Sequence, residues 1–129
     1  MGIITPGKST VLRSGRIGST SGTSVFFSIL SSPSGIAVDV SGNVYFSDTM
    51  NHCIRRLDTL GNLALYAGTP GVSGYQNGAP MISKFDTPSA VAIDRDGNLY
   101  VADKLNDTIR IIERNYIYDS SNNLQAIQG

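Results

Sequence analysis

The chain lacks tryptophan, has a single cysteine and a single histidine, and contains no long hydrophobic run. Because Cys53 stands alone, no disulfide can form within the chain, which excludes a disulfide-stapled scaffold. The absence of about 18 consecutive apolar residues excludes a membrane-spanning helix. Ten basic residues balance ten acidic ones, so the chain lacks the basic excess with which proteins bind nucleic acid.

The residues that are plentiful favour β-structure. Hydrophobic residues make up 40% of the 129 residues, which suffices for a core of one domain. Glycine, serine, asparagine and aspartate are common, whereas glutamate occurs once, at Glu113. This balance favours turns and strands over helices.

A gap-free internal repeat relates residues 33–57 to residues 88–112. When the sequence is shifted by 55 places, eleven of these 25 positions are identical. Half of the others exchange one apolar residue for another, such as Ile36 for Val91. A repeat of this kind is typical of proteins built from stacked supersecondary units.

Each copy predicts three strands and hints at a fourth. A Gly-Asn pair, Gly42-Asn43 or Gly97-Asn98, separates the first two strands, and both residue types tolerate the positive φ of a tight turn. The frame Asn-Leu-x-x-x-x-Gly predicts the fourth strands. The expected strands are Gly35–Asp39, Val44–Ser47, Cys53–Leu57 and Asn62–Gly68, then Ala90–Asp94, Leu99–Ala102, Thr108–Ile112 and Asn123–Gly129.

The expected fold is all-β, with four-stranded antiparallel meanders. The first two strands of each copy are apolar on both faces, which predicts sheets covered on both sides and stacked as blades of a β-propeller. The predicted boundaries are a first blade at 33–68, a Gly-rich inter-blade link at 69–87 and a second blade at 88–129. Residues 1–32 would hold the outer strand of an incomplete blade, at Val11–Arg13, and another link. The alternative is two independent meanders or a small sandwich.

The two copies resemble the NHL-repeat family of β-propellers. They read PSGIAVDVSGNVYFSDTMNHCIRRLD and PSAVAIDRDGNLYVADKLNDTIRII, close to the family pattern of Pro-x-Gly-Val-Ala-Val-Asp, Gly-Asn-Leu-Tyr-Val-Ala-Asp and Asn-His-Arg-Ile-Arg. Met50 and Leu105 stand where the family often has glycine, and Cys53 and Thr108 where it often has arginine. The resemblance implies two NHL-type blades plus a partial one.

Two blades would leave two apolar sheet faces uncovered, and repeat proteins generally need at least about three units. Three hypotheses follow. The chain is a segment of a larger propeller, or a protomer whose copies complete one another, or a stable pair of blades. The expected partners are therefore the remaining blades of the same propeller or other copies of the chain.

The repeated polar residues are interpreted as structural. Asp39, Asp48, Asp94 and Asp103 end strands at equivalent positions, and a catalytic residue is needed once rather than in every blade. The stretch Asp94–Asn98 resembles the start of a calcium loop but lacks the closing acidic ligand.

Three further residue types have structural interpretations as well. His52 is expected to be a loop residue, because one histidine cannot build the channel metal site of propeller lyases or lactonases. Cys53 is expected to be a packing thiol, because the adjacent His52 would point to the opposite face of a strand and could not act as its catalytic partner. Arg55 and Arg110 are expected to form surface ion pairs with strand-end aspartates. No catalytic, cofactor-binding or metal-binding residue is therefore predicted.

The function predicted is a non-enzymatic module that binds a protein or glycan. The alternatives are a structural subunit of an extracellular assembly or filament joined by strand addition, and an excerpt of a propeller lyase or lactonase. The segments that do not repeat are expected to recognise the partner, and an extracellular or cell-surface location is favoured. Asn106 also fits the acceptor motif for N-glycosylation. The predicted interaction residues are Thr49, Met50, Asn51, His52, Tyr75, Gln76, Asn77, Lys104, Leu105, Asn106 and Asp107.

Overall fold

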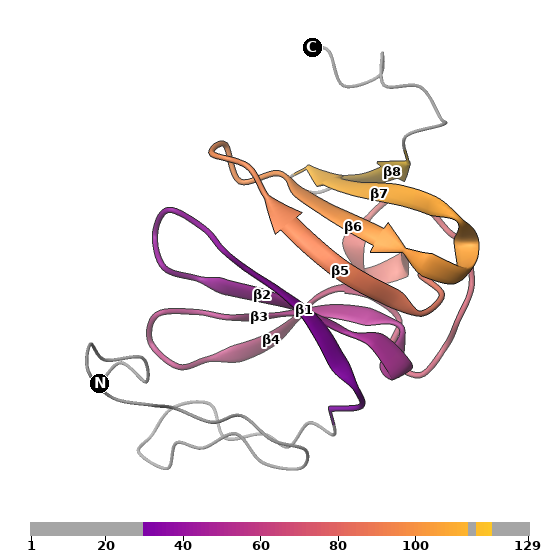
Figure 1. Cartoon of the computed structure of the whole chain (residues 1–129), viewed down its shortest axis with the longest axis horizontal. Coiled ribbons are helices and arrows are strands. Elements are labelled where there is room, and N and C mark those ends of the chain that lie inside the picture. The colour runs from indigo at the N-terminus through magenta and orange to yellow at the C-terminus, as the bar shows by residue number, and fades with distance from the viewer. Residues whose placement is uncertain (1–29, 114–115, 120–129) are drawn as a thin grey trace.

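The computed structural model describes residues 30–113 and 116–119, which form two four-stranded antiparallel sheets (Figure 1). In each sheet the strand order follows the chain, so each is a meander. The first blade contains β1 (Pro33–Val38), β2 (Val44–Asp48), β3 (Cys53–Leu57) and β4 (Leu63–Gly68). The second contains β5 (Pro88–Ile93), β6 (Leu99–Asp103), β7 (Thr108–Glu113) and β8 (Tyr116–Asp119).

The described residues contain no α-helix, which confirms the all-β prediction. Three single turns of 3-10 helix connect the strands: η1 (Thr49–Asn51), η2 (Pro80–Ile82) and η3 (Lys104–Asn106). η1 and η3 occupy equivalent places between the second and third strands of their blades. Within the described ranges, no helix is long and apolar enough to cross a membrane.

The first hairpin of each blade closes with the sequence Asp-x-x-Gly-Asn. Gly42 and Gly97 adopt φ of 97° and 90°, as predicted, whereas the asparagine that follows each glycine does not take a positive φ. The glycine alone supplies the left-handed residue because it has no Cβ to clash. The connection between β3 and β4 repeats this arrangement at Asp58–Asn62, with Gly61 at φ 91°.

The fourth strand of the second blade differs from the prediction. β8, at Tyr116–Asp119, pairs with β7 in the register Arg110 to Asp119 and Ile112 to Ile117. Tyr-Ile-Tyr has high β-propensity and follows β7 closely, so it takes the edge position expected for Asn123–Gly129. Residues 123–129 and the predicted strand Val11–Arg13 lie outside the described residues.

The two blades stack face to face and bury a shared core between them (Figure 1). The first blade contributes Tyr45, Ile54 and Ala67 to this core. The second blade and the link contribute Phe85, Leu99, Val101, Ile112 and Ile117, with Val91 and Ile93 partly buried. On the other face of the first sheet, Leu30, Phe46, Leu57 and Leu63 form a second buried cluster. The expectation that both faces of each sheet are covered is thus met at the shared face and in part on this second face, where Ile36 and Val38 of β1 are exposed.

The inner strands of the two blades approach closely. A Cβ atom at Gly35 would lie 2.6 Å from the Cα atom of Ala90, far inside the van der Waals contact distance. Glycine at this position therefore sets the spacing between β1 and β5.

Candidate interaction surface

A buried carboxylate holds the first blade together. Asp48, at the end of β2, accepts a hydrogen bond at Oδ1 from the Ser31 backbone N–H at 2.7 Å. Its Oδ2 atom accepts bonds from Asn51 Nδ2 at 2.9 Å and Arg55 Nε at 2.8 Å. The Asp48 side chain thus binds three segments by hydrogen bonds: the chain entering the blade, the η1 turn and strand β3.

The second blade repeats this arrangement with Asp103. Its carboxylate accepts bonds from the Asp86 backbone N–H at 2.8 Å, Asn106 Nδ2 at 2.8 Å and Arg110 Nη1 at 2.7 Å. We call each set a carboxylate hub, and its core is an aspartate and an arginine of the same blade.

The interpretation of these pairs as surface ion pairs was wrong. Asp48, Asp103 and Arg110 are fully buried and Arg55 is nearly so. Strand alternation and register place each aspartate and its arginine on the same sheet face, where the side chains meet beneath the η turn. Burial makes these pairs far more sensitive to loss of one partner than a surface pair is.

Arg110 also reaches beyond its blade and fixes the link, residues 69–87. Its Nη1 donates to the Lys84 carbonyl at 2.8 Å, and its Nη2 donates to the Gln76 carbonyl and to Asn77 Oδ1, both at 2.8 Å. Its Nε donates a longer bond of 3.2 Å to Asn77 Oδ1. The guanidinium therefore ties both limbs of the link to the second blade.

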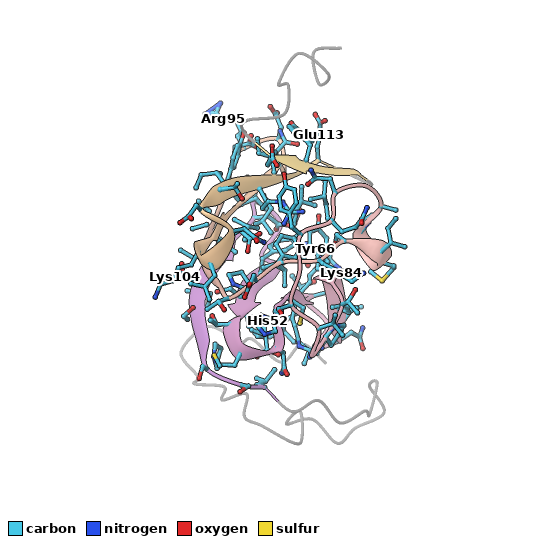
Figure 2. All side chains as sticks on the ribbon, turned by 90° about the vertical axis from the view of Figure 1, so that its right-hand side faces the viewer. His52, Tyr66, Lys84, Arg95, Lys104 and Glu113 are labelled. Atoms are coloured by element: carbon cyan, nitrogen blue, oxygen red, sulfur yellow. The ribbon has the colours of Figure 1, made fainter. Side chains whose placement is uncertain are left out.

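Two aromatic rings enclose the same guanidinium. The Arg110 Cζ atom lies 4.7 Å from the ring centroid of Tyr75 and 4.7 Å from that of Phe85, within the range of cation–π attraction. Phe85 is fully buried in the inter-blade core, whereas Tyr75 is about half exposed. Lys84, next to Phe85, lies near the boundary between the two blades (Figure 2).

The link has its own backbone pairing. Gln76 and Lys84 form an antiparallel bridge across the link, and Gly78 bridges to Ile117 of β8. Ser83 is fully buried and its hydroxyl accepts a hydrogen bond from the Gly68 backbone N–H at 2.9 Å. The link is therefore a folded element and not a loose connection.

Large apolar side chains of the link face solvent. Tyr75, Met81, Ile82 and Val72 are exposed by 49%, 57%, 56% and 43%. These side chains project from a backbone that the bonds to Arg110 hold in place. Tyr75, Gln76 and Asn77, which the sequence predicted as interaction residues, lie together in this element.

The other predicted residues lie in the two η turns. Met50 and Leu105 are exposed at equivalent positions, whereas Asn51 and Asn106 point inward to the carboxylate hubs. Lys104 projects from the edge of the molecule (Figure 2). The turns therefore combine an exposed apolar tip with an asparagine that anchors the turn.

The residues that end these turns are both left-handed. His52 and Asp107 adopt φ of 56° and 53°. His52 Nδ1 accepts a hydrogen bond from the Thr87 backbone N–H at 3.0 Å, and it lies 3.8 Å from Asp86 Oδ1. His52 thus connects the first blade to the segment that enters the second, and Thr49 does the same through a 2.7 Å bond from its hydroxyl to the Pro88 carbonyl.

The amide of Asn106 is engaged inside the protein. Its Nδ2 atom donates to Asp103 Oδ2 at 2.8 Å and to the Gly74 carbonyl at 2.9 Å. A glycan would be attached at this same nitrogen, so its attachment to the folded blade would disturb both bonds. Glycosylation of Asn106 stays a prediction.

The hairpin aspartates have a local structural role. Asp39 and Asp94 each accept two backbone N–H bonds at 2.9 Å and further bonds from an asparagine and a tyrosine side chain. Desolvation raises the pKa of both carboxyls, but these hydrogen bonds outweigh it and leave each pKa below its usual value. Across the described ranges, no group of three His, Cys, Asp or Glu side chains could hold a metal ion.

The sequence reading missed two features of this surface. The anchoring of the link by Arg110 was not expected, because its partners Lys84 and Phe85 lie in a segment without a counterpart motif. The turn at Asp58–Asn62 was also missed, although its sequence, DTLGN, has the same Asp-x-x-Gly-Asn pattern as the first hairpins. A search for that pattern would have found it.

Four-stranded meanders that stack face to face in chain order define the described residues as blades of a β-propeller. Residues 30–57 match the model of the NHL repeat. The first blade therefore carries an NHL repeat, and the second blade repeats its sequence pattern, as the resemblance of the two copies implied.

Similar proteins come from plants and animals. Protein SUPPRESSOR OF QUENCHING 1, chloroplastic, from Arabidopsis thaliana is 32% identical over 92 residues, which cover 71% of this chain and 9% of that protein. Human (Homo sapiens) Teneurin-4 is 32% identical over 114 residues, which cover 78% of this chain and 4% of that protein. The chain thus spans less than a tenth of the length of these relatives.

Similar solved structures support the fold. A protein of unknown function from Bacteroides thetaiotaomicron has a TM-score of 0.60 and 30% identity, over 67% of this chain and 21% of that one. A streptogramin B lyase has a TM-score of 0.52 and 19% identity, over 69% of this chain and 26% of that one. The likeness to the lyase concerns the fold alone.

We predict that the carboxylate hub of the second blade is far more important for stability than the hairpin aspartate. Asp103→Ala leaves the buried guanidinium of Arg110 without its carboxylate and should cost about 3–5 kcal/mol in the free energy of unfolding. Asp94→Ala, the matched control on an exposed hairpin, should cost about 1 kcal/mol. Urea unfolding measures both, and equal losses would contradict the hub.

The second prediction concerns the thiol of Cys53, which is fully buried at the start of β3. Burial raises the pKa of this thiol to about 12, with a lowering contribution from Arg55 and a raising one from Asp48. Since the thiolate is the reactive form, the folded chain should not react with an aromatic disulfide reagent at pH 8. The urea-unfolded chain is the control and should react fully, and rapid reaction of the folded chain would refute the prediction.

Proposed function

We propose that the chain is a non-enzymatic interaction module whose NHL-type blades present the link, residues 69–87, to a protein partner. The observation that carries the proposal is the fixation of the link by Arg110. A surface that is held rigid before binding loses less conformational entropy when a partner arrives.

The composition of the exposed link favours a protein over a glycan as the partner. Tyr75 and Met81 belong to the residue types that are enriched at protein–protein interfaces, and Ile82 and Val72 extend the apolar surface. Exposed apolar surface on a rigid scaffold is typical of protein docking sites. The blades and their hubs then act as the scaffold, and the part of the chain that does not repeat makes the contacts.

The described residues offer little support for the alternative of an enzyme. The aspartates that the repeats share are occupied by hydrogen bonds within their own turns and hubs. Cys53 is buried, and His52 Nδ1 accepts a backbone hydrogen bond. None of these groups is arranged as a nucleophile beside a base.

The proposal includes an extracellular or cell-surface location. A single thiol that is fully buried, as Cys53 is, does not endanger a protein in oxidising surroundings. The same buried thiol would also be harmless in a reducing compartment, so the location rests on the proposed role as a display scaffold.

Selection of peptides from a random phage-displayed library against the folded chain tests the proposed surface. We expect Tyr75→Ala and Met81→Ala to weaken the selected peptides by about tenfold or more, since each removes an exposed apolar contact. Leu60→Ala is the matched control, because Leu60 is an equally exposed apolar residue on the hairpin between β3 and β4.

Three outcomes would contradict the proposal. Peptides that bind both link variants as tightly as the unmodified chain would place recognition elsewhere. Binding to a glycan array without binding to any peptide would exclude a protein partner as the ligand class. Stoichiometric metal in the purified chain, together with lyase or lactonase activity, would show an enzyme.

A further inference from the structure

The link contains the single Asn-Gly pair of the sequence, Asn77-Gly78. In any asparagine, the amide carbon of the side chain lies close enough to the next backbone nitrogen for the two to join in a five-membered ring. Glycine leaves this nitrogen most accessible, because it carries no Cβ. By contrast, Asn43, Asn62 and Asn98 each precede valine or leucine, whose side chains hinder the approach. Sequence chemistry therefore makes Asn77 more reactive than these three asparagines.

The conformation of the link requires the glycine of this pair. Gly78 adopts φ of 114°, a backbone conformation that residues with a Cβ rarely take. A Cβ atom at Gly78 would meet the Cδ1 atom of Ile82 at 3.6 Å, which is ordinary van der Waals contact. The backbone, and not a lack of space, therefore demands glycine here. The reactive pair is thus a consequence of the shape of the link.

The fold holds both reacting groups in place. The Gly78 N–H donates a 2.8 Å hydrogen bond to the Ile117 carbonyl of β8. Asn77 Oδ1 accepts bonds from Nη2 and Nε of Arg110 at 2.8 and 3.2 Å. Ring closure requires the Gly78 nitrogen to lose its proton and to turn toward the Asn77 side chain, so its bond to Ile117 must break first. The reaction is therefore delayed in the folded chain and follows the local release of Gly78 from β8.

The surroundings of the Asn77 amide suit a carboxylate. Arg110 directs two N–H groups at Oδ1, whereas Nδ2 donates one long bond of 3.4 Å to the Tyr75 hydroxyl. Asp103 binds the same guanidinium at a different nitrogen, Nη1. A guanidinium binds a carboxylate more strongly than a neutral amide oxygen. A carboxylate at residue 77 would therefore keep both bonds to Arg110 and strengthen them.

We propose that Asn77 is a deamidation site: the fold delays the loss of its amide, and Arg110 binds the carboxylate that results. This modification changes the link chemically whatever the link binds, so it does not rest on the proposed interaction function.

The reaction needs water and no other reagent. The Gly78 nitrogen forms a bond to Cγ of Asn77, and the amide group leaves as ammonia with the proton that the nitrogen loses. The product is a cyclic imide. Water then opens the ring at one of its two carbonyl carbons and supplies the new carboxylate oxygen. The sum is one water consumed and one ammonia released, without oxidation or reduction.

The two directions of ring opening have different structural consequences. Opening at Cγ gives aspartate and restores the original backbone, so Arg110 gains a charged partner. Opening at the backbone carbonyl gives isoaspartate, in which the main chain runs through the side chain and is one carbon longer. This longer main chain moves Gly78 relative to Ile117 and disturbs the bridge between the link and β8.

Peptide mass spectrometry of the full chain after incubation at mildly alkaline pH measures the conversion at each asparagine. In guanidinium chloride, Asn77 should convert about tenfold or more faster than Asn43, Asn62 and Asn98. In the folded chain its conversion should be about tenfold or more slower than in the unfolded chain, because Gly78 must first open. Asn77→Gln is the matched control and should abolish conversion at this position, since its longer side chain would have to form a six-membered ring.

Two results of this experiment would overturn the proposal. Conversion of Asn77 in the unfolded chain no faster than that of the other three asparagines would show that it is not the reactive site. Equal rates in the folded and unfolded chains would show that the bond from Gly78 to Ile117 does not delay the reaction.

The Asn77→Asp variant tests the binding of the product by Arg110. Arg110 should lower the pKa of the new carboxyl below its value in the unfolded chain, so the gain in stability is present above that value and lost as the pH falls through the folded pKa. Between about pH 3 and about pH 7, the urea midpoint of the variant should therefore rise relative to that of the unmodified chain. A relative midpoint that falls with rising pH would show repulsion by Asp103 and overturn the role of Arg110.

Asn98→Asp is the matched control with the opposite sign. Asn98 Nδ2 donates a 3.0 Å hydrogen bond to Asp94 Oδ2, so a carboxylate at residue 98 would face a second carboxylate. Its urea midpoint should fall relative to the unmodified chain over the same pH range. The same pH dependence in both variants would overturn the proposal, because it would show that the sign does not depend on Arg110.

Discussion

A buried carboxylate at the end of the second strand is the interaction on which each blade depends. Asp48 and Asp103 accept hydrogen bonds from the backbone that enters the blade, from the η turn and from the arginine of the third strand. An unpaired charge in this position would be costly, so the three segments must arrive together. The hub therefore couples the inner strand, the turn and the third strand into one unit, which is the unit that the sequence repeats.

The repeat made the blades predictable because equivalent positions of the two copies have the same structural role. The strand pattern, the glycine of the hairpin turn and the stacking of meanders all follow from residues that the two copies share. The burial of the carboxylate hubs was not predicted, because the seven-residue spacing between the aspartate and the arginine does not indicate whether the pair is exposed to solvent. The register between the second and third strands determines this burial, and the sequence alone does not give that register.

The segments without a counterpart could not be predicted in the same way. The predicted position of the fourth strand of the second blade was wrong. The frame Asn-Leu-x-x-x-x-Gly placed this strand at Asn123–Gly129, whereas β8 follows β7 closely and pairs with it through Tyr-Ile-Tyr. The link was predicted only as Gly-rich and polar. Its structure depends on Arg110, whose bonds to Gln76 and Lys84 span 34 and 26 residues. Contacts of this range leave no local signal.

The central claim is that Arg110 joins the link, residues 69–87, to the second blade, so that one buried residue holds both segments in place. Amide hydrogen exchange of the unmodified chain tests this most directly. The account predicts that the amides of Gly74, Gln76, Gly78 and Lys84, which are hydrogen-bonded within the link or to β8, exchange as slowly as those of the second blade. Exchange of these amides at the rate of an unstructured peptide, while β5 to β7 stay protected, would contradict it.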